Sequence, residues 1–291
     1  MIFLVFIGLF FILGVFPYFR YALFHPVKTI PQFFRDFYKK VKFKENNKCP
    51  YYGKIFTFTA SDSQAFGSGK TLSMVRWVRD VYRRYNGLRV WDGEKFVEQK
   101  IIIVSNLRFH DIPYIPFIGK DQFVNIDQIE HTENDVIIFV VDEAGMEFNS
   151  RKYKENLPTD FLVRLLQVRH NKITLCMTSQ RFGFIDKVLR NTCEVVTTCK
   201  KKWRIVRLQD YDAYALENCS NPEIIRPIST RFYFASDKLF NAYDTTYNVT
   251  KLKEELQTGQ LLTTPEILSI TGDSSSPDNA KSFFRRKFRK E

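Results

Sequence analysis

The sequence predicts an α/β fold in which a mainly parallel β-sheet lies between helices. Three runs rich in apolar and β-branched residues predict buried strands: residues 55–60, 135–143 and 173–180. The second and third runs end in polar side chains, and a glycine-rich loop follows the first. Beyond that loop, apolar residues at three- and four-residue spacing predict an amphipathic helix.

The loop after the first strand predicts a phosphate-binding P-loop, because it joins a strand to a helix and reads Gly-Ser-Gly-Lys-Thr. Gly67 and Gly69 let backbone N–H groups approach phosphate oxygens without a Cβ in the way, Ser68 lies between them in the same nucleotide-binding loop, and the start of the helix adds its positive dipole end. Lys70 is expected to bind the β- and γ-phosphates of ATP, and the Thr71 hydroxyl is expected to bind Mg²⁺.

Gln64 stands where the usual P-loop pattern has its first glycine. A left-handed backbone there would strain Gln64 by roughly 1 kcal/mol, whereas a relaxed turn would lose little. The alternative interpretation of the loop is a glycine-rich turn that happens to carry a Lys-Thr pair. The carboxylates that end the second predicted strand favour the P-loop.

Polar side chains end the second and third predicted strands. Phosphoryl transfer needs a carboxylate at a strand tip for Mg²⁺, which predicts Asp142, and a group that activates water, which predicts Glu143. Carboxyl ends of parallel strands share one edge, so Gln180 is expected near Lys70, where its amide could sense the γ-phosphate or orient water. A turn after the strand would also explain the Asp-Glu pair, and the opening of a loop would explain Gln180.

Composition points to an anionic partner and a reducing compartment. The 291 residues carry a formal charge of +12, which is typical of proteins that contact nucleic acid or an anionic membrane face. Five cysteines without a C-x-x-C spacing predict reduced thiols, and four scattered histidines do not suggest a metal cage.

The N-terminus predicts a membrane anchor over residues 1–24. The first 19 residues carry no charge and could span a bilayer as a helix. A signal peptide and a buried core helix are the alternatives, but no basic residue precedes the apolar run and no small-residue cleavage site follows. Basic residues follow it, which predicts a single pass through the membrane with the remainder in the cytoplasm.

Five segments are predicted along the chain. After the anchor come a basic juxtamembrane segment at 25–50, which could lie on lipid or be a solvated linker, and the ATPase core at 51–207. Residues 208–270 have no assigned fold, and residues 271–291 form a flexible basic tail that binds anionic lipid or nucleic acid, or only solubilises. Within the core we expect a hairpin at 88–97, a strand at 101–106, a helix around 161–170 and later strands at 195–198 and 203–206.

Five short elements follow one another at characteristic spacings: Gly-Ser-Gly-Lys-Thr, Val-Ser-Asn-Leu (104–107), Val-Val-Asp-Glu-Ala (140–144), Val-Arg-His (168–170) and Ser-Gln (179–180). This order resembles that of the zonular occludens toxin-like (Zot) ATPases. These are morphogenesis proteins of filamentous phages within the FtsK/HerA-type branch of P-loop motor ATPases. The resemblance covers roughly residues 53–207.

The resemblance implies a P-loop NTPase that binds ATP and Mg²⁺ through Lys70, Thr71 and Asp142, with Glu143 catalytic and Gln180 as a sensor. It also implies a homo-oligomer, expected to be a ring, that acts on phage DNA, single-stranded DNA in particular, with coat or assembly proteins as further partners. Ring ATPases often use an arginine of a neighbouring subunit, and Arg190 is the candidate here.

The function expected from the sequence is a membrane-anchored P-loop ATPase that drives phage-type assembly or extrusion, or DNA translocation. The alternative is a membrane scaffold with a decayed P-loop that docks DNA or virion proteins without hydrolysis, which Gln64 would favour. A small-molecule kinase fits less well, because the chain carries a predicted anchor, a basic tail and no arginine-rich lid.

Overall fold

A computed structural model of the chain describes residues 17–61, 63–148, 159–219 and 224–244. The chain divides into two compact units. The smaller unit comprises residues 1–48 and 89–97, and the larger unit comprises residues 49–88 and 98–291.

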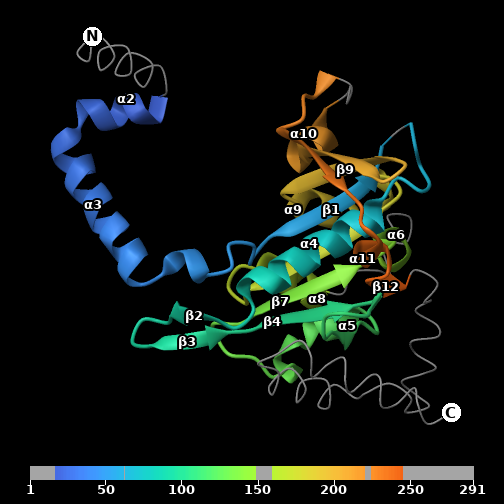
Figure 1. Cartoon of the computed structure of the whole chain (residues 1–291), viewed down its shortest axis with the longest axis horizontal. Coiled ribbons are helices and arrows are strands. Elements are labelled where there is room, and N and C mark those ends of the chain that lie inside the picture. Colours follow the sequence, from blue (N-terminus) through green and yellow to red (C-terminus); the bar gives the residue numbers. More distant parts are fainter. Residues whose placement is uncertain (1–16, 62, 149–158, 220–223, 245–291) are drawn as a thin grey trace. The chain divides into compact units, whose positions relative to one another are not determined.

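The larger unit is built on an eight-stranded sheet (Figure 1). In spatial order its strands are β11 (Ser229–Phe234), β10 (Ile205–Asp212), β9 (Val195–Lys202), β1 (Ile55–Ala60), β8 (Ile173–Ser179), β7 (Val136–Val141), β4 (Ile101–Ser105) and β6 (Ile115–Pro116). The strands from β9 to β6 run parallel, and β10 and β11 are antiparallel additions at one edge. The predicted α/β fold with a mainly parallel sheet is therefore confirmed.

Helices cover both faces of this sheet. The long helix α4 (Lys70–Tyr85) crosses one face, as Figure 1 shows. The opposite face is covered by α5 (Lys120–Val124), α8 (Thr159–Leu166), α9 (Lys187–Thr192) and α10 (Ala213–Asn218). Along β7, alternate residues enter the two cores, because successive side chains of a strand point to opposite faces. Burial on both sides explains why the central strands are uninterrupted apolar runs.

Short elements connect the strands of the larger unit. They are η2 (Ile126–Gln128), α6 (Ala144–Glu147), η4 (Phe182–Phe184), α11 (Asp237–Phe240) and a small antiparallel pair of β5 (Arg108–Phe109) and β12 (Tyr243–Asp244). In the smaller unit, which includes residues 89–97, a hairpin pairs β2 (Leu88–Trp91) with β3 (Phe96–Gln99), and the predicted Asp92-Gly93 turn joins the two strands. The five cysteines are free thiols, as their spacing predicts.

The sheet continues beyond residue 207, where the sequence left the fold open. The later strands predicted at 195–198 and 203–206 are β9 and β10, each eight residues long. Lys200, Lys201 and Lys202 belong to β9 and do not form a loop between the two strands. β11 then completes an antiparallel edge.

The smaller unit holds α2 (Pro17–Phe24), α3 (Pro26–Lys42) and η1 (Glu45–Asn47). Within the part of the chain that the structure describes, no helix is long and apolar enough to cross a membrane. Most of the predicted anchor lies at residues 1–16, outside the described residues, and so does the predicted tail at 271–291.

Candidate nucleotide-binding site

The predicted P-loop follows β1 and ends at the first turn of α4. Gly67 has φ of 65° and Gly69 has φ of 86°, so both adopt the left-handed backbone that favours glycine. The Gly69 carbonyl accepts hydrogen bonds from the backbone N–H of Ser73, at 2.9 Å, and from its hydroxyl, at 2.7 Å. The loop therefore leads directly into a helix whose N-terminal N–H groups face the loop.

Gln64 does not adopt a left-handed backbone, so the strain considered for this position is absent. Its side chain instead ties the loop to the sheet. Gln64 Nε2 donates to the Gly67 carbonyl at 3.3 Å, and Gln64 Oε1 accepts from the Lys201 N–H of β9 at 3.2 Å. The residue that replaces the first glycine of the usual pattern thus bonds both the loop backbone at Gly67 and the neighbouring strand β9.

Lys70, Glu143 and Gln180 meet in one cluster at the carboxyl edge of the sheet. Lys70 Nζ donates to Gln180 Oε1 at 3.0 Å and lies 3.6 Å from Glu143 Oε1. Gln180 Nε2 donates to the same Glu143 oxygen at 3.0 Å. The Lys70 side chain is only 7% exposed, so its charge is held in place by these two partners. The structure therefore brings together the predicted phosphate-binding lysine, water-activating carboxylate and sensor.

Thr71 and Asp142, the predicted Mg²⁺ pair, are in direct contact. Thr71 Oγ1 donates to Asp142 Oδ1 at 2.8 Å, and Thr178 Oγ1 donates to the same oxygen at 2.6 Å. Thr178 also accepts the backbone N–H of Glu143 at 2.9 Å. Two threonine hydroxyls therefore hold the Asp142 carboxylate, and one of them also fixes the backbone of Glu143.

Asn106 fixes the backbone at Asp142. Its Nδ2 donates to the Asp142 carbonyl at 2.9 Å, and its Oδ1 accepts the Asp142 N–H at 2.8 Å. Glu143 follows with φ of 51°, which is uncommon for a residue other than glycine. Such strained backbone is often found at functional sites, where surrounding bonds maintain it.

Burial raises the pKa of the Asp142 carboxyl above its ordinary value, although hydrogen bonds from Thr178 and Thr71 and the nearby Lys70 oppose that rise. A divalent cation would stabilise the ionised carboxylate that burial disfavours. The local chemistry therefore suits a cation bound by the Asp142 carboxylate.

The loop also offers an unsatisfied polar group. Ser68 Oγ is buried, and among the described residues it has no hydrogen-bond partner. A phosphate cradled by the Gly67–Gly69 backbone would supply an acceptor of the kind that this hydroxyl lacks. The residues present thus fit a nucleotide with Mg²⁺: Gly67, Ser68, Gly69 and Lys70 for phosphate, and Thr71 with Asp142 for the ion.

Arg190 is not among the side chains brought to Lys70. Its guanidinium forms an ion pair with Glu217 of α10. The same guanidinium lies over the ring of Phe182, 6.0 Å from its centroid, in the short helix η4 that follows β8. The structure therefore engages Arg190 with Glu217 and Phe182. A role in a neighbouring subunit stays a prediction, and it would require this ion pair to break.

Sequence reasoning gave no individual role to Asn106 or Thr178. Like Asp142, each of them is a polar residue at or next to the end of a buried apolar strand. This position in the sequence could have identified both as candidate site residues. Both roles depend on strand neighbours, since β7 lies between β4 and β8 in the sheet.

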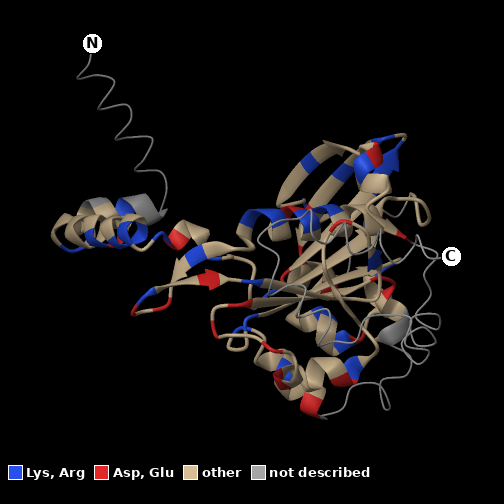
Figure 2. Cartoon of the chain, turned by 60° about the horizontal axis from the view of Figure 1, so that its bottom comes forward, with Lys and Arg blue, Asp and Glu red and all other residues tan. Residues whose placement is uncertain are grey.

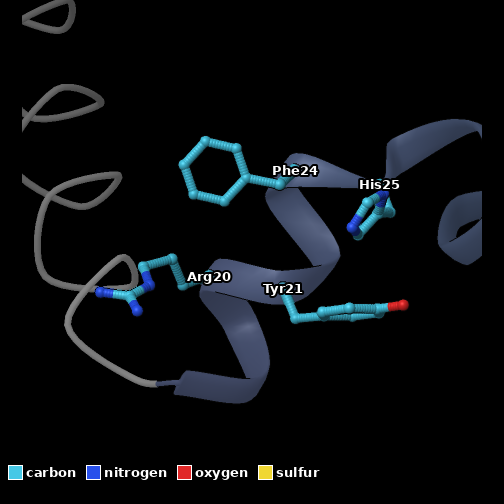
Figure 3. A pocket seen from close by; sticks show the side chains of 4 residues that line it. All are labelled: Arg20, Tyr21, Phe24 and His25. Atoms are coloured by element: carbon cyan, nitrogen blue, oxygen red, sulfur yellow. The ribbon is translucent and has the colours of Figure 1, made fainter.

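A separate pocket lies on α2 and the residue that follows it, lined by Arg20, Tyr21, Phe24 and His25. Figure 3 shows that these side chains leave one helical segment in different directions and do not converge on a point. Convergent polar groups are the mark of a ligand site, so the candidate site remains the P-loop cluster.

Residues 62–247, more than half of the chain, match the family model described as zonular occludens toxin (Zot). No curated protein matches the chain.

Three solved structures are similar to this chain. The N-terminal domain of zonular occludens toxin from Neisseria meningitidis is 19% identical, with a TM-score of 0.45 over 66% of this chain and 100% of that one. The genome packaging NTPase B204 of Sulfolobus turreted icosahedral virus 2, in complex with ATP-gammaS, is 10% identical, with a TM-score of 0.41 over 63% and 98%. EccC (ATPases 2 and 3) of Thermomonospora curvata is also 10% identical, with a TM-score of 0.36 over 63% of this chain and 36% of that one.

The family match contains the whole cluster from the P-loop to Gln180, and it extends through β9, β10 and β11. The resemblance inferred from short motifs is thereby confirmed. This chain belongs to the zonular occludens toxin (Zot) family.

Proposed function

We propose that this chain is a membrane-attached ATPase that drives phage-type assembly or extrusion, or DNA translocation, by hydrolysing ATP. The observation that carries the proposal is the cluster in which Lys70, Gln180 and Glu143 contact one another beside the Thr71–Asp142 pair. These are the groups that phosphoryl transfer requires: a cation for phosphate, a carboxylate for Mg²⁺ and a carboxylate beside the attacking water.

Each residue has a defined task in this proposal. When bound, Mg²⁺ would neutralise phosphate charge from the side of Thr71 and Asp142. Lys70 binds phosphate oxygens and balances the charge that develops on them. Glu143 accepts a proton from the attacking water, and Gln180, which hydrogen-bonds both Lys70 and Glu143, holds the two in register.

Helix α3 supports membrane attachment. Val27, Ile30, Phe34, Phe37 and Val41 recur at three- and four-residue spacing and share one helical face. The large apolar residues of α3 are 53–85% exposed, and the helix has no buried residue. Figure 2 shows lysine and arginine recurring along the same helix.

An exposed apolar face opposite basic residues is typical of a helix that lies in a membrane interface. We propose that α3 rests on the cytoplasmic surface of the host inner membrane, next to an anchor formed by the uncharged first 19 residues. Subunits are proposed to assemble there as a ring that acts on single-stranded DNA, with phage coat or assembly proteins as further partners.

The decisive experiment measures nucleotide binding and Mg²⁺-dependent ATP turnover by the full chain in detergent. Lys70→Ala should lose both, whereas Glu143→Gln should keep binding and lose about 10²- to 10³-fold of turnover. Lys54→Ala and Glu98→Gln are matched controls, because Lys54 pairs with Glu194 and the Glu98 side chain is exposed. Wild-type protein that binds no nucleotide would overturn the ATPase and favour the scaffold.

Membrane attachment is tested separately by flotation with vesicles that contain anionic lipid. Phe34→Ser with Phe37→Ser should weaken flotation, whereas Phe232→Ser with Phe234→Ser on β11 should not. Equal flotation of the two double variants would mean that α3 does not contribute to membrane attachment.

A further inference from the structure

We propose that the outer face of β9, β10 and β11 is a binding platform for single-stranded nucleic acid. This proposal deepens the function proposed above and rests on it for the choice of DNA as ligand. The platform is defined by seven residues: Lys200, Lys202, Trp203, Ile205, Arg207, Phe232 and Phe234.

The strand register arranges these residues in two rows across the three strands. One row is Lys202, Ile205 and Phe234, and the next is Lys200, Arg207 and Phe232. The residues between them, such as Val206 and Tyr233, are buried in the core that contains α4. Because successive side chains alternate, the two rows point to the opposite face of the sheet.

The aromatic members of the platform are open to solvent. Phe232 is 65% exposed, Phe234 is 57% exposed and Trp203, at the β9–β10 turn, is 73% exposed. The Trp203 and Phe234 rings lie edge to face with centroids 5.8 Å apart. Trp203 also has φ of 56°, and a bulky residue in this region is uncommon. Three large rings thus stand exposed at one end of an antiparallel sheet.

The basic members of the platform have no ion-pair partner within the part of the chain that the structure describes. Among the described residues, Lys200, Lys202 and Arg207 form no ion pair, although Arg204 and Arg231 nearby pair with Asp237 and Asp210. Neither row contains a carboxylate. The face therefore combines uncompensated positive charge with aromatic rings.

This combination favours single-stranded nucleic acid over other occupants. Unpaired bases stack on exposed aromatic rings, while lysine and arginine bind the phosphates between them. Protein–protein interfaces are depleted in lysine, so a protein partner fits less well. A duplex hides its bases within the stack, so the rings favour a single strand.

The inner face of the same three strands holds the nucleotide loop. Gln64 of the loop accepts the Lys201 N–H, and the Tyr233 hydroxyl lies 2.9 Å from Ser73 Oγ in the first turn of α4. Ser73 in turn bonds the Gly69 carbonyl at 2.7 Å. Nucleic acid on the outer face would thus contact strands that also position the P-loop, which provides a direct structural link between the two sites.

The test measures fluorescence anisotropy of a labelled single-stranded DNA of about 16 nucleotides with the full chain in detergent, over a series of salt concentrations. Phe232→Ala with Phe234→Ala should weaken binding about ten-fold or more and leave the salt dependence unchanged. Lys200→Gln, Lys202→Gln and Arg207→Gln together should lower the slope of log affinity against log salt by about two.

Matched controls remove exposed residues outside the platform: Phe184→Ala with Val188→Ala, and Lys187→Gln. They should leave DNA binding unchanged, and every platform variant should keep basal ATP turnover. The platform is overturned if wild-type protein does not bind the strand, or if the platform variants bind as wild type does. Loss of self-association with unchanged DNA binding would instead make this face a subunit contact.

The two proposals can fail independently. A chain that hydrolyses no ATP, yet loses DNA binding only in the platform variants, would retain the platform and lose the motor. A chain that hydrolyses ATP, with DNA binding indifferent to these variants, would retain the ATPase and lose the platform.

Discussion

Positive charge occurs both at the P-loop, where Lys70 carries it, and on the outer face of β9–β11, but the surroundings of the charged groups differ. At the P-loop, Lys70 is buried and contacts Glu143 and Gln180. On the outer face, Lys200 and Lys202 are exposed and, within the described residues, form no ion pair. The first environment holds one charge in a fixed place, and the second leaves several charges available at a surface.

The two environments suit the two kinds of anion in the proposals above, a nucleotide phosphate and a nucleic-acid strand. A compact phosphate group is best stabilised by preorganised donors in a dry site, where rearrangement during the reaction is small. An extended polyanion gains affinity by releasing counterions from many exposed contacts, each of them weak. The parallel strands supply the first environment, and the antiparallel edge supplies the second.

Among these predictions, removal of the Asp142 carboxylate should change activity the most. Asp142→Asn should reduce Mg²⁺-dependent ATP turnover by about 100-fold or more, because the amide cannot supply the negative charge that the ion requires. The same variant should raise the melting temperature of the metal- and nucleotide-free protein. Burial raises the folded-state pKa of the Asp142 carboxyl above its unfolded value, so the wild-type protein loses stability as the pH rises from the unfolded to the folded pKa, and the Asn variant does not.

Thermal unfolding across pH checks this sign. The stability gained by Asp142→Asn should be largest near about pH 8 and should shrink toward about pH 2, where the wild-type carboxyl is protonated in both the folded and the unfolded state. If Asp142→Asn left the melting temperature at high pH unchanged or lowered it, burial of the ionised Asp142 carboxylate would not destabilise the fold as proposed.

A smaller effect is expected from removing the Asn106 bracket. Asn106→Ala leaves the N–H and carbonyl of Asp142 without these partners, which costs about 1–3 kcal/mol of unfolding free energy and should lower turnover about ten-fold. Chemical denaturation and steady-state kinetics measure both, and Asn125→Ala, at an exposed position, is the control. Normal turnover in Asn106→Ala would mean that the strand tip needs no such support.

Gly69→Ala tests whether the loop backbone is preorganised. A left-handed residue other than glycine costs roughly 1 kcal/mol, and the shifted N–H groups should weaken nucleotide binding. Gly183→Ala is the matched control, since a Cβ there meets nothing within 4 Å and its φ is not positive. Equal nucleotide affinity in the two variants would contradict the proposed loop geometry.

The smallest expected effect links the two regions. Gln64→Ala removes the contact between the loop and the Lys201 N–H at the rim of the platform strands. We expect a loss of about 0.5–1.5 kcal/mol in unfolding free energy with nucleotide affinity changed by only a few-fold. Isothermal titration with nucleotide provides the measurement. A complete loss of binding would make Gln64 part of the phosphate site itself.

Most of the candidate site could be predicted because its elements are local. The P-loop from Gly67 to Thr71 is contiguous, and Asp142 and Glu143 end a strand that is evident from composition alone. The clustering of Gln180 with Lys70 followed from one rule, that parallel strands present their carboxyl ends at one edge. The membrane anchor and the basic tail stay predictions, since they fall largely or wholly outside the described residues.

Other features required the tertiary structure, because they depend on which strands become neighbours. Asn106 and Thr178 reach Asp142 only because β7 lies between β4 and β8. The role of Gln64 depends on a strand that begins about 130 residues later. Sequence spacing carries no information about such pairings.

The residue types of the candidate site are evident in the sequence, which shows a predicted P-loop, two strand-tip carboxylates and a surplus of basic residues. The arrangement of basic and aromatic residues on β9, β10 and β11 depends on the tertiary structure. Alternation and register of β9, β10 and β11 place Lys200, Arg207 and Phe232 in one outward-facing row, with Val206 and Tyr233 directed into the core that contains α4. The reason is geometric, because the two faces of a strand acquire different roles only when neighbouring strands and helices cover one of them.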